Sequence, residues 1–426
     1  MKKVLIITYY WPPSGGAGVQ RWLKFVKYLR EFGWEPIIYT PENAEMPSLD
    51  NSLIKDVPEG VEVLKTPIWE PYDAYKKLVG QKKEEKINAG FLSENKKPKR
   101  TEKLAVWIRG NFFIPDARKF WIKPSVEYLK NYLKDNPVDV IISTGPPHSM
   151  HLIAKEIKRS LEIKWVADFR DPWTNIDFYK DLMLSSTADK KHKRLEKEVL
   201  QEADVVLSVG ATLGKELTEL GATRSEVITN GYDLEENVES VPLDEKFSIA
   251  HIGTMTKSRN PIVLWNVLSS LVNQNEKFKE RLEIKLVGKV DISVMDSIEK
   301  HGLSNYVRKI DYLPHDEVIL EQRKSHLLLL VVNNTPNAKG ILTGKFFEYM
   351  SSGRPTLCIG PKDGDVAEII KETQVGEVFE NSENEKLGSY ILESFAGEIE
   401  NDSNPSIEKY SRRELTKNLA SILDSL

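Results

Sequence analysis

Residues 4–40 read VLIITYYWPPSGGAGVQRWLKFVKYLREFGWEPIIYT and contain the signals for a strand, a loop, a helix and a second strand. Residues 4–8 form an aliphatic and β-branched run, as expected for a strand that is covered on both faces. Over residues 19–32 the apolar side chains recur at helical spacing, and Gly33 can end that helix with a positive φ. Residues 36–40 are the second strand. This order predicts that the two strands pair in parallel.

The same alternation continues along the chain. Further strand-like runs end near a glycine or a polar loop, at residues 138–144, 164–169, 204–210, 226–231, 247–253, 282–288, 326–332 and 355–360. Residues 235–245 are acidic and have no apolar pattern, which indicates a domain boundary. We therefore expect an α/β protein with two Rossmann-like, doubly wound domains facing a cleft, over residues 1–235 and 246–405. The segment 406–426 has helical spacing and could pack back on the N-terminal domain.

The composition excludes several classes of protein. The 426 residues suit two domains, and a net charge of −4 provides no strong field for nucleic acid. Cys358 is the single cysteine, which excludes an intrachain disulfide and fits a reducing compartment. The apolar run at the N-terminus is short and is followed by Trp-Pro-Pro, unlike a signal peptide. No run approaches the roughly 20 apolar residues of a transmembrane helix. We expect a cytoplasmic protein.

The first loop contains Gly15, Gly16 and Gly18 between the first strand and the first helix. Glycines at a helix N-terminus let backbone N–H groups approach an anion, and the helix dipole favours negative charge there. A dinucleotide fingerprint requires a third glycine at the position of Arg21, so that motif is absent. The alternatives are a phosphate-binding loop, which we favour, and a tight turn without a ligand.

A second candidate anion site lies in residues 337–355, NAKGILTGKFFEYMSSGRP, after the strand that ends near residue 332. We expect a helix to begin near Thr343. Thr343, Gly344 and Lys345 would then offer backbone N–H groups and an ammonium to a diphosphate. Glu348 lies one turn further on and suits the hydroxyls of a ribose. The alternative is an ordinary surface Lys–Glu pair. Residues 340–345 are one residue short of a P-loop, which excludes a P-loop NTPase.

These motifs together resemble the GT-B glycosyltransferases of the family 4 type. The resemblance is carried by the run Lys-x-x-Glu-Tyr-Met-x-x-Gly-x-Pro from Lys345, by the PPSGGAG loop, by VITNGYD at residues 227–233, and by HIGT at residues 251–254 with its following basic residues. The order and spacing of these pieces cover nearly the whole chain. Many members have two glutamates separated by seven residues; Glu348 matches the second, and Gly340 stands in place of the first.

The resemblance implies roles for several residues. Arg259 and Lys345 would neutralise the donor diphosphate, with Lys257 as a second candidate for the first of these positions. Glu348 would hold the ribose, and the loop with Gly15, Gly16 and Gly18 would approach the diphosphate from the other domain. The cations take the place of a metal, so that no metal and no other cofactor is expected.

Two further strand ends carry candidate residues. His148, in STGPPHSMH, is placed for the sugar or the acceptor, although a lone histidine is often structural. Asp171, in ADFRDPW, is an acceptor-side candidate through the resemblance, and pairing with Arg170 is its alternative. Asp363-Gly-Asp365 matches an Asp-x-Asp metal pattern, but we interpret Asp365 as a helix N-cap instead.

The sequence therefore predicts a retaining, metal-independent hexosyl- or related transferase. It would move a sugar from a nucleoside diphosphate sugar to a glycan or lipid-linked acceptor in cell-surface polysaccharide synthesis. The alternatives are a nucleotide-sugar epimerase of the same fold, a non-catalytic sugar-nucleotide-binding protein and, more distantly, an NAD-dependent oxidoreductase. Basic residues and Trp107, Phe112 and Phe113 in the stretch 82–115 allow peripheral contact with the inner face of a membrane. A solvated loop beside a buried aromatic cluster is the favoured alternative.

Overall fold

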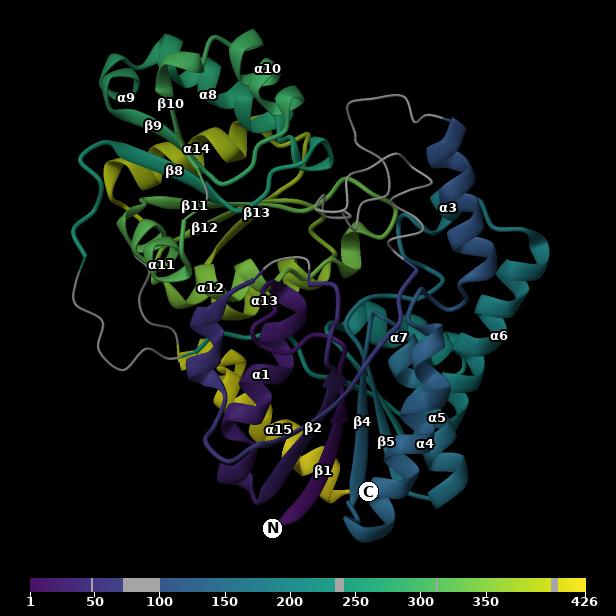
Figure 1. Cartoon of the computed structure of the whole chain (residues 1–426). Helices are drawn as coiled ribbons and strands as arrows, with labels where there is room; N and C mark the ends of the chain where they lie inside the picture. The colour runs from purple at the N-terminus through teal and green to yellow at the C-terminus, as the bar shows by residue number, and fades with distance from the viewer. Residues whose placement is uncertain (47–48, 72–99, 234–240, 312, 400–404) are drawn as a thin grey trace. The chain divides into compact units, whose positions relative to one another are not determined.

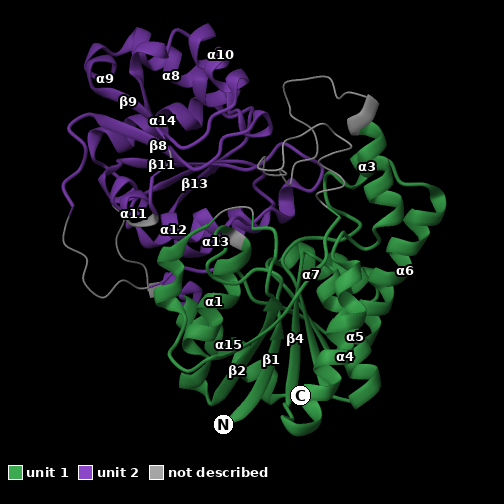
Figure 2. Cartoon of the chain, in the orientation of Figure 1, with its two compact units in different colours: residues 1–229, 412–426 green, residues 230–411 purple. Residues whose placement is uncertain are grey.

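The computed structural model describes residues 1–46, 49–71, 100–233, 241–311, 313–399 and 405–426. The chain forms two compact units, coloured green and purple in Figure 2. Unit 1 contains residues 1–229 and 412–426, and unit 2 contains residues 230–411. Unit 1 therefore ends before residue 235, the limit expected from the sequence. Most of the charged stretch before residue 100 and part of the acidic segment 235–245 lie outside the described residues.

In the described part of unit 1, a seven-stranded parallel sheet has the order β3-β2-β1-β4-β5-β6-β7 (Figure 1). Its strands are β1 (Lys2–Ile7), β2 (Trp34–Pro41), β3 (Glu62–Thr66), β4 (Val140–Gly145), β5 (Lys164–Phe169), β6 (Val205–Ser208) and β7 (Ser225–Val227). Its helices are α1 (Ala17–Leu29), α3 (Arg100–Phe112), α4 (Lys119–Asp135), α5 (Ser149–Leu161), α6 (Ser186–Glu202), α7 (Ala211–Leu220) and α15 (Arg412–Asp424).

Residues of β1 alternate between two hydrophobic cores, one on each face of this sheet. Leu5 and Ile7 pack with α4 and α5, whereas Val4 and Ile6 pack with α1 and α15. The C-terminal helix α15 lies against α1, and Leu419 is completely buried there (Figure 1). The same hydrophobic core therefore contains residues of β1 and α1 and residues of α15.

In the described part of unit 2, a six-stranded parallel sheet has the order β10-β9-β8-β11-β12-β13. Its strands are β8 (Phe247–Ile252), β9 (Leu282–Val287), β10 (Val307–Ile310), β11 (Leu327–Val331), β12 (Thr356–Ile359) and β13 (Gly376–Phe379). Its helices are α8 (Ile262–Gln274), α9 (Glu276–Arg281), α10 (Ile292–Lys300), α11 (His315–Lys324), α12 (Gly344–Ser351), α13 (Asp365–Thr373) and α14 (Asn384–Ala396). Helices α8, α10 and α14 cover one face, and α12 and α13 cover the other.

Both sheets have a point at which the strand order reverses. In unit 1, β1 lies between β2 and β4, and in unit 2, β8 lies between β9 and β11. Ligands of open α/β sheets bind outside the carboxyl ends of the strands at such switch points. The α/β class and the two doubly wound, Rossmann-like units are confirmed. Among the described helices, none has both the length and the apolarity to cross a bilayer.

Candidate functional site

The switch point of unit 2 brings Lys345 next to His251. Lys345 is in the first turn of α12, and its Nζ lies 3.5 Å from Nε2 of His251 at the end of β8. His251 Nδ1 donates to the carbonyl of Leu329 at 3.1 Å, so Nε2 of the neutral ring is an acceptor that faces the ammonium. Burial and the Lys345 charge lower the pKa of His251 to about 3. The ring therefore stays neutral beside the lysine.

A second cation, Arg259, belongs to the same switch point. It ends the 3₁₀ helix η4 (Lys257–Arg259) that follows β8, and its Nε donates to Oδ1 of Asn333, which follows β11, at 2.5 Å. Its Nη1 donates to the carbonyl of Thr254 at 3.3 Å. Lys257, in contrast, is exposed. The structure thus places Arg259, but not Lys257, in a defined hydrogen-bonded position.

The pKa of Lys345 shows that the two cations act on each other. Burial and, to a smaller extent, the Arg259 charge together lower this pKa to about 8, against the opposing effect of Glu348. Burial also lowers the pKa of Arg259. Among the described residues, neither Lys345 nor Arg259 has a carboxylate at salt-bridge distance. Two partly buried cations without such a partner favour an anionic ligand.

Helix α12 presents its N-terminus at the same place. Its N-cap is Thr343, as expected from the sequence, and a Cβ added at Gly344 would meet no atom within 4 Å. The hydroxyl of the buried Tyr349 accepts from the backbone N–H of Ile252 at 3.0 Å and so fixes α12 against β8. Glu348 accepts from Nε2 of Gln322 at 3.4 Å. Tyr349 thus fixes the helix, and the Thr343 side chain does not cap it, so that its first N–H groups could receive an anion.

Gly253 is the residue that leaves room for Lys345. It has a φ of +110°, and a Cβ there would lie 2.8 Å from Lys345 Nζ. Gly253→Ala should therefore weaken anion binding by about tenfold or more, because it strains the backbone by about 1–3 kcal/mol and displaces the ammonium. Titration with a nucleoside diphosphate measures this effect.

Gly302→Ala is the matched control, because Gly302 has a φ of +71° and a Cβ there would meet no atom within 4 Å. This variant should share the loss of stability and keep the affinity. Equal affinities of the two variants would contradict a role of Gly253 in placing Lys345.

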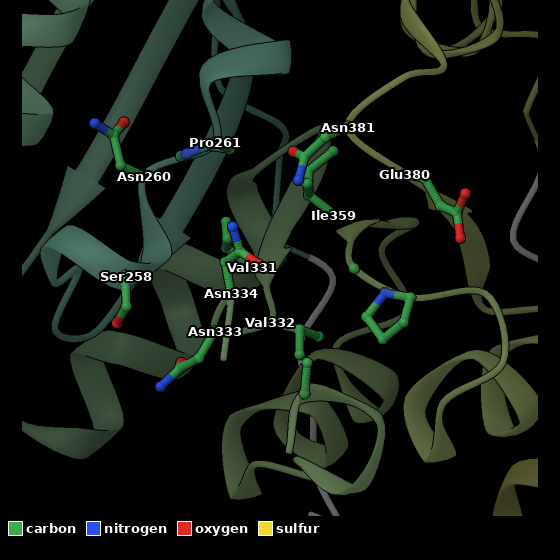
Figure 3. A pocket seen from close by; sticks show the side chains of 13 residues that line it. Ser258, Asn260, Pro261, Val331, Val332, Asn333, Asn334, Ile359, Glu380 and Asn381 are labelled. Carbon is green, nitrogen blue, oxygen red and sulfur yellow. The ribbon is translucent and has the colours of Figure 1, made fainter. Parts of the chain in front are cut away.

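A cavity of about 250 Å³ with a mixed polar and apolar lining lies at the carboxyl ends of β11, β12 and β13 (Figure 3), and one of its lining residues, Asn333, accepts from Arg259. Its lining includes Ser258, Asn333, Asn334, Glu380 and Asn381. Pockets for drug-sized ligands measure about 300–1,000 Å³, so this cavity is smaller than such pockets. Amide, hydroxyl and carboxylate groups would hydrogen-bond a neutral, hydroxylated group there.

The glycines of the first loop, at the switch point of unit 1, differ from one another. Gly16 is the N-cap of α1 with a φ of +98°, and a Cβ there would meet nothing within 4 Å. A Cβ at Gly18 would lie 2.7 Å from Nη1 of Arg170, which donates to the Gly18 carbonyl at 2.8 Å. Gly15 is buried. The absence of a side chain at Gly18 thus permits its contact with Arg170, whereas there is open space next to Gly16. The binding of a diphosphate by this loop stays a prediction.

Asp168 anchors the helix that follows this loop, and the sequence did not single it out. It accepts from Arg21 Nη2 at 2.9 Å, from Trp22 Nε1 at 2.7 Å and from Thr144 Oγ1 at 2.8 Å, and it is completely buried. Burial alone would raise its pKa, but Arg21 and these hydrogen bonds outweigh burial and lower it. The signal in the sequence was an aspartate at the end of a buried strand.

His148 and Asp171 follow β4 and β5 of unit 1. His148 is the N-cap of α5 and is buried, and its Nδ1 has no hydrogen-bond partner among the described residues. Burial lowers its pKa well below the usual value. Asp171 is exposed. The neighbouring Arg170 donates to the carbonyls of Gly18 and Pro146, and the Asp171 charge raises the pKa of its guanidinium against the larger effect of burial.

The aromatic residues of α3 are partly exposed, so the favoured interpretation as a buried cluster is wrong for two of them. Trp107 is 40% and Phe112 is 59% exposed, and their ring centroids lie 5.7 Å apart. Residues 82–99 of the same stretch lie outside the described residues. Contact with a membrane stays a prediction.

The Asp-x-Asp stretch requires one correction. The N-cap of α13 is Gly364, and Asp365 is the first residue of the helix rather than its cap, because the chain enters the helix one residue earlier than we expected. Asp363 forms an ion pair of 2.5 Å with Lys339. Within the described residues no group of three His, Cys, Asp or Glu side chains could hold a metal.

The fold is similar to those of several solved structures. The apo lipopolysaccharide outer core galactosyltransferase WaaB is 14% identical with a TM-score of 0.59, and each chain is covered completely. A complex of TarM from S. aureus with UDP is 12% identical with a TM-score of 0.59, also over both whole chains. A putative UDP-N-acetylglucosamine 2-epimerase from Listeria monocytogenes is 11% identical with a TM-score of 0.56, covering 99% of this chain and 96% of that one.

Residues 91–236 match the family model described as Glycosyltransferase Family 4. This chain has the GT-B fold, and its residues 91–236 are similar to family 4 glycosyltransferases. The resemblance inferred from the motifs is therefore confirmed, and the findings support a GT-B glycosyltransferase. No curated protein sequence matches the chain. The matched residues belong mainly to unit 1, whereas Lys345 and Arg259 of this GT-B chain belong to unit 2.

Proposed function

We propose that this chain is a retaining glycosyltransferase that moves a sugar from a nucleoside diphosphate sugar to a glycan or lipid-linked acceptor, in the synthesis of a cell-surface polysaccharide. The observation that carries the proposal is the pair formed by Lys345 and Arg259. Both cations are partly buried at the switch point of unit 2, beside the accessible N-terminus of α12, and neither has a salt-bridge partner among the described residues. This arrangement suits the diphosphate of the donor.

In the proposed reaction, negative charge develops on the phosphate that leaves the sugar. The bond between the anomeric carbon and the β-phosphate oxygen breaks, the acceptor oxygen bonds to that carbon on the same face, and a nucleoside diphosphate and a proton are released. Charge develops on the leaving phosphate, so Arg259 and Lys345 stabilise the transition state more than the ground state. We propose that these two cations supply the stabilisation that a metal ion would otherwise give.

The remaining donor groups can be assigned in the same proposal. Glu348, on the same helix as Lys345, would accept hydrogen bonds from the ribose hydroxyls. Gly340 provides no carboxylate for the sugar. We infer that Asn333 and Asn334, which line the cavity at the carboxyl end of β11, supply hydrogen bonds to sugar hydroxyls instead. His148 would act on the sugar or the acceptor, with Asp171 on the acceptor side.

A panel of UDP-, GDP- and ADP-sugars tests the proposal, first by thermal shift and then by release of nucleoside diphosphate. At least one donor should raise the Tm and be turned over with an acceptor, and turnover should persist in EDTA. His148→Ala should keep the thermal shift and lower kcat by about 10²-fold or more, the usual effect of removing a general acid or base.

Ser160→Ala, a change at an exposed site on α5, is the control for His148→Ala and should leave kcat unchanged. If His148→Ala had the kcat of the wild type, His148 would have only a structural role. A wild-type protein that binds none of the donors would contradict the donor site itself.

A nucleotide-sugar epimerase is the second candidate, because the Listeria monocytogenes structure of that description shares the fold. An epimerase would use the same donor site without an acceptor. Incubation of the protein with the bound donor alone separates the two functions: an epimerised sugar nucleotide indicates the epimerase, and product that forms only with an acceptor indicates the transferase. Binding without any product would indicate a non-catalytic protein.

A further inference from the structure

His148 is held on one face by an aromatic ring from a different loop. The ring of Trp173, four residues after the end of β5, stacks on the imidazole with a centroid distance of 4.4 Å and an interplanar angle of 4°. Trp173 is 3% exposed. Gly145 also gives the imidazole room, since a Cβ there would lie 3.0 Å from Nδ1 of His148. The stacking therefore restricts rotation of the imidazole, while its buried Nδ1 has no hydrogen-bond partner among the described residues.

Trp173 is in turn held by helix α6. Its Nε1 donates to Nδ1 of His192 at 3.1 Å. The next residue, Thr174, donates to the Glu196 carboxylate through its backbone N–H at 3.2 Å and its hydroxyl at 2.5 Å. His192 and Glu196 are one turn apart and buried, so they form a single face of α6 that fastens the loop after β5.

Protonation is consistent with this arrangement. Burial lowers the pKa of His192, so the ring stays neutral and its Nδ1 can accept from the indole. Trp173 can only donate, which fixes the direction of that hydrogen bond. The hydrogen bonds from α6 therefore fix the position of the loop after β5. Trp173, which is part of this loop, in turn fixes the position of the His148 ring through the stacking contact.

We propose that Trp173, fastened by His192, is a positioning residue that holds the imidazole of His148 in the orientation needed at the sugar or acceptor. The inference rests on the proposed function in assigning His148 to the reaction, and it gives a role to Trp173 and His192, for which the sequence motifs indicated none. Without the indole, χ2 of His148 would sample a broad, two-fold well. A misplacement of about 1 Å can lower a rate by about 10²-fold.

A double-mutant cycle of Trp173→Leu and His148→Ala tests the proposal kinetically. Trp173→Leu should lower kcat by about 10- to 100-fold and leave the KM for the donor unchanged. Trp173→Phe keeps a stacking ring and should recover most of the rate. In the His148→Ala background, Trp173→Leu should have no further effect. An equal loss of kcat in both backgrounds would show a merely structural role and overturn the proposal.

Tyr128→Leu is the matched control, because Tyr128 stacks on Tyr39 in the same unit with centroids 5.8 Å apart and lies outside the site. Its kcat should equal that of the wild type.

A second measurement needs no turnover and so separates this inference from the proposed function. In ¹⁵N-histidine NMR spectra, the ring-nitrogen signals of His148 can be assigned because they are absent from the spectrum of the His148→Ala variant. Trp173→Leu should shift these ring-nitrogen signals, and His192→Gln should shift them less. Unchanged His148 signals in a folded Trp173→Leu variant would overturn the inference even in an active enzyme. A shift in a protein that transfers no sugar would uphold the positioning and refute the transferase.

Discussion

Lys345→Ala is expected to abolish the binding of every nucleoside diphosphate sugar that the wild-type protein binds. The ammonium lies at the N-terminus of α12 beside Arg259, where burial already lowers its pKa, and a diphosphate would be its main counter-charge. Removal of one partner of a buried charge pair typically lowers affinity by about 2–5 kcal/mol, or roughly 30- to 5,000-fold. Isothermal titration with the donor and with the free nucleoside diphosphate measures the loss.

Lys279→Ala is the control for this variant. Lys279 is exposed on α9 and pairs with Glu276, so its removal should change neither affinity nor fold. Binding of a donor by Lys345→Ala with the wild-type affinity would show that the diphosphate lies elsewhere.

The same lysine should give donor binding a characteristic dependence on pH. With a pKa of about 8, Lys345 is mainly charged at pH 7 and loses its proton as the pH rises through 8. Affinity for the anionic donor should therefore fall above pH 8. Because the bound anion stabilises the ammonium, the decline should occur at a somewhat higher pH than the pKa of the free protein. If the Lys345→Arg variant still binds the donor, its affinity should show no such decline, since a guanidinium stays charged to about pH 12.

Asp168→Ala is expected to destabilise unit 1 by about 3–5 kcal/mol, because it leaves the buried Arg21 guanidinium without its counter-charge. The indole N–H of Trp22 and the hydroxyl of Thr144 lose their acceptor in the same step. Such a loss is a large part of the about 5–15 kcal/mol that stabilises a typical domain. Urea unfolding, followed by tryptophan fluorescence, measures the change.

Asp135→Ala is the control, since it removes an exposed carboxylate at the end of α4 in the same unit. It should change the free energy of unfolding by no more than about 0.5 kcal/mol. If Asp168→Ala lost less than about 1 kcal/mol, the buried Arg21–Asp168 pair would not be the anchor of α1 that its geometry indicates.

Hydrophobic runs and glycines were sufficient to predict most of the fold. The buried strands β1, β5, β8, β9 and β11 coincide closely with their apolar runs because both faces of each are covered. The strands that the sequence analysis missed are β3, β10 and β13, and each lies at an edge of its sheet or carries exposed polar residues. An edge strand buries less surface, so its sequence need not be apolar.

The candidate site was predictable only in part. Lys345, Thr343 and Glu348 lie within six consecutive residues, so that local spacing alone placed them together. The partners that define their environment come from elsewhere: His251 and Arg259 follow β8, and Asn333 follows β11. No local pattern connects these loops, because β8 and β11 become neighbours only through the order of the crossovers.

Local sequence thus sufficed for the class of fold, for the start of α12 and for the kinds of side chain that could receive a diphosphate, because hydrophobic periodicity and glycine conformation act over a few residues. The assembled protein alone made Arg259 rather than Lys257 the fixed cation, gave Gly18 its contact with Arg170, and set Trp173 and His192 behind His148. Each of these contacts joins segments that are distant in the chain. Their proximity depends on which strands become neighbours in a sheet, and this is decided by the packing of the whole unit.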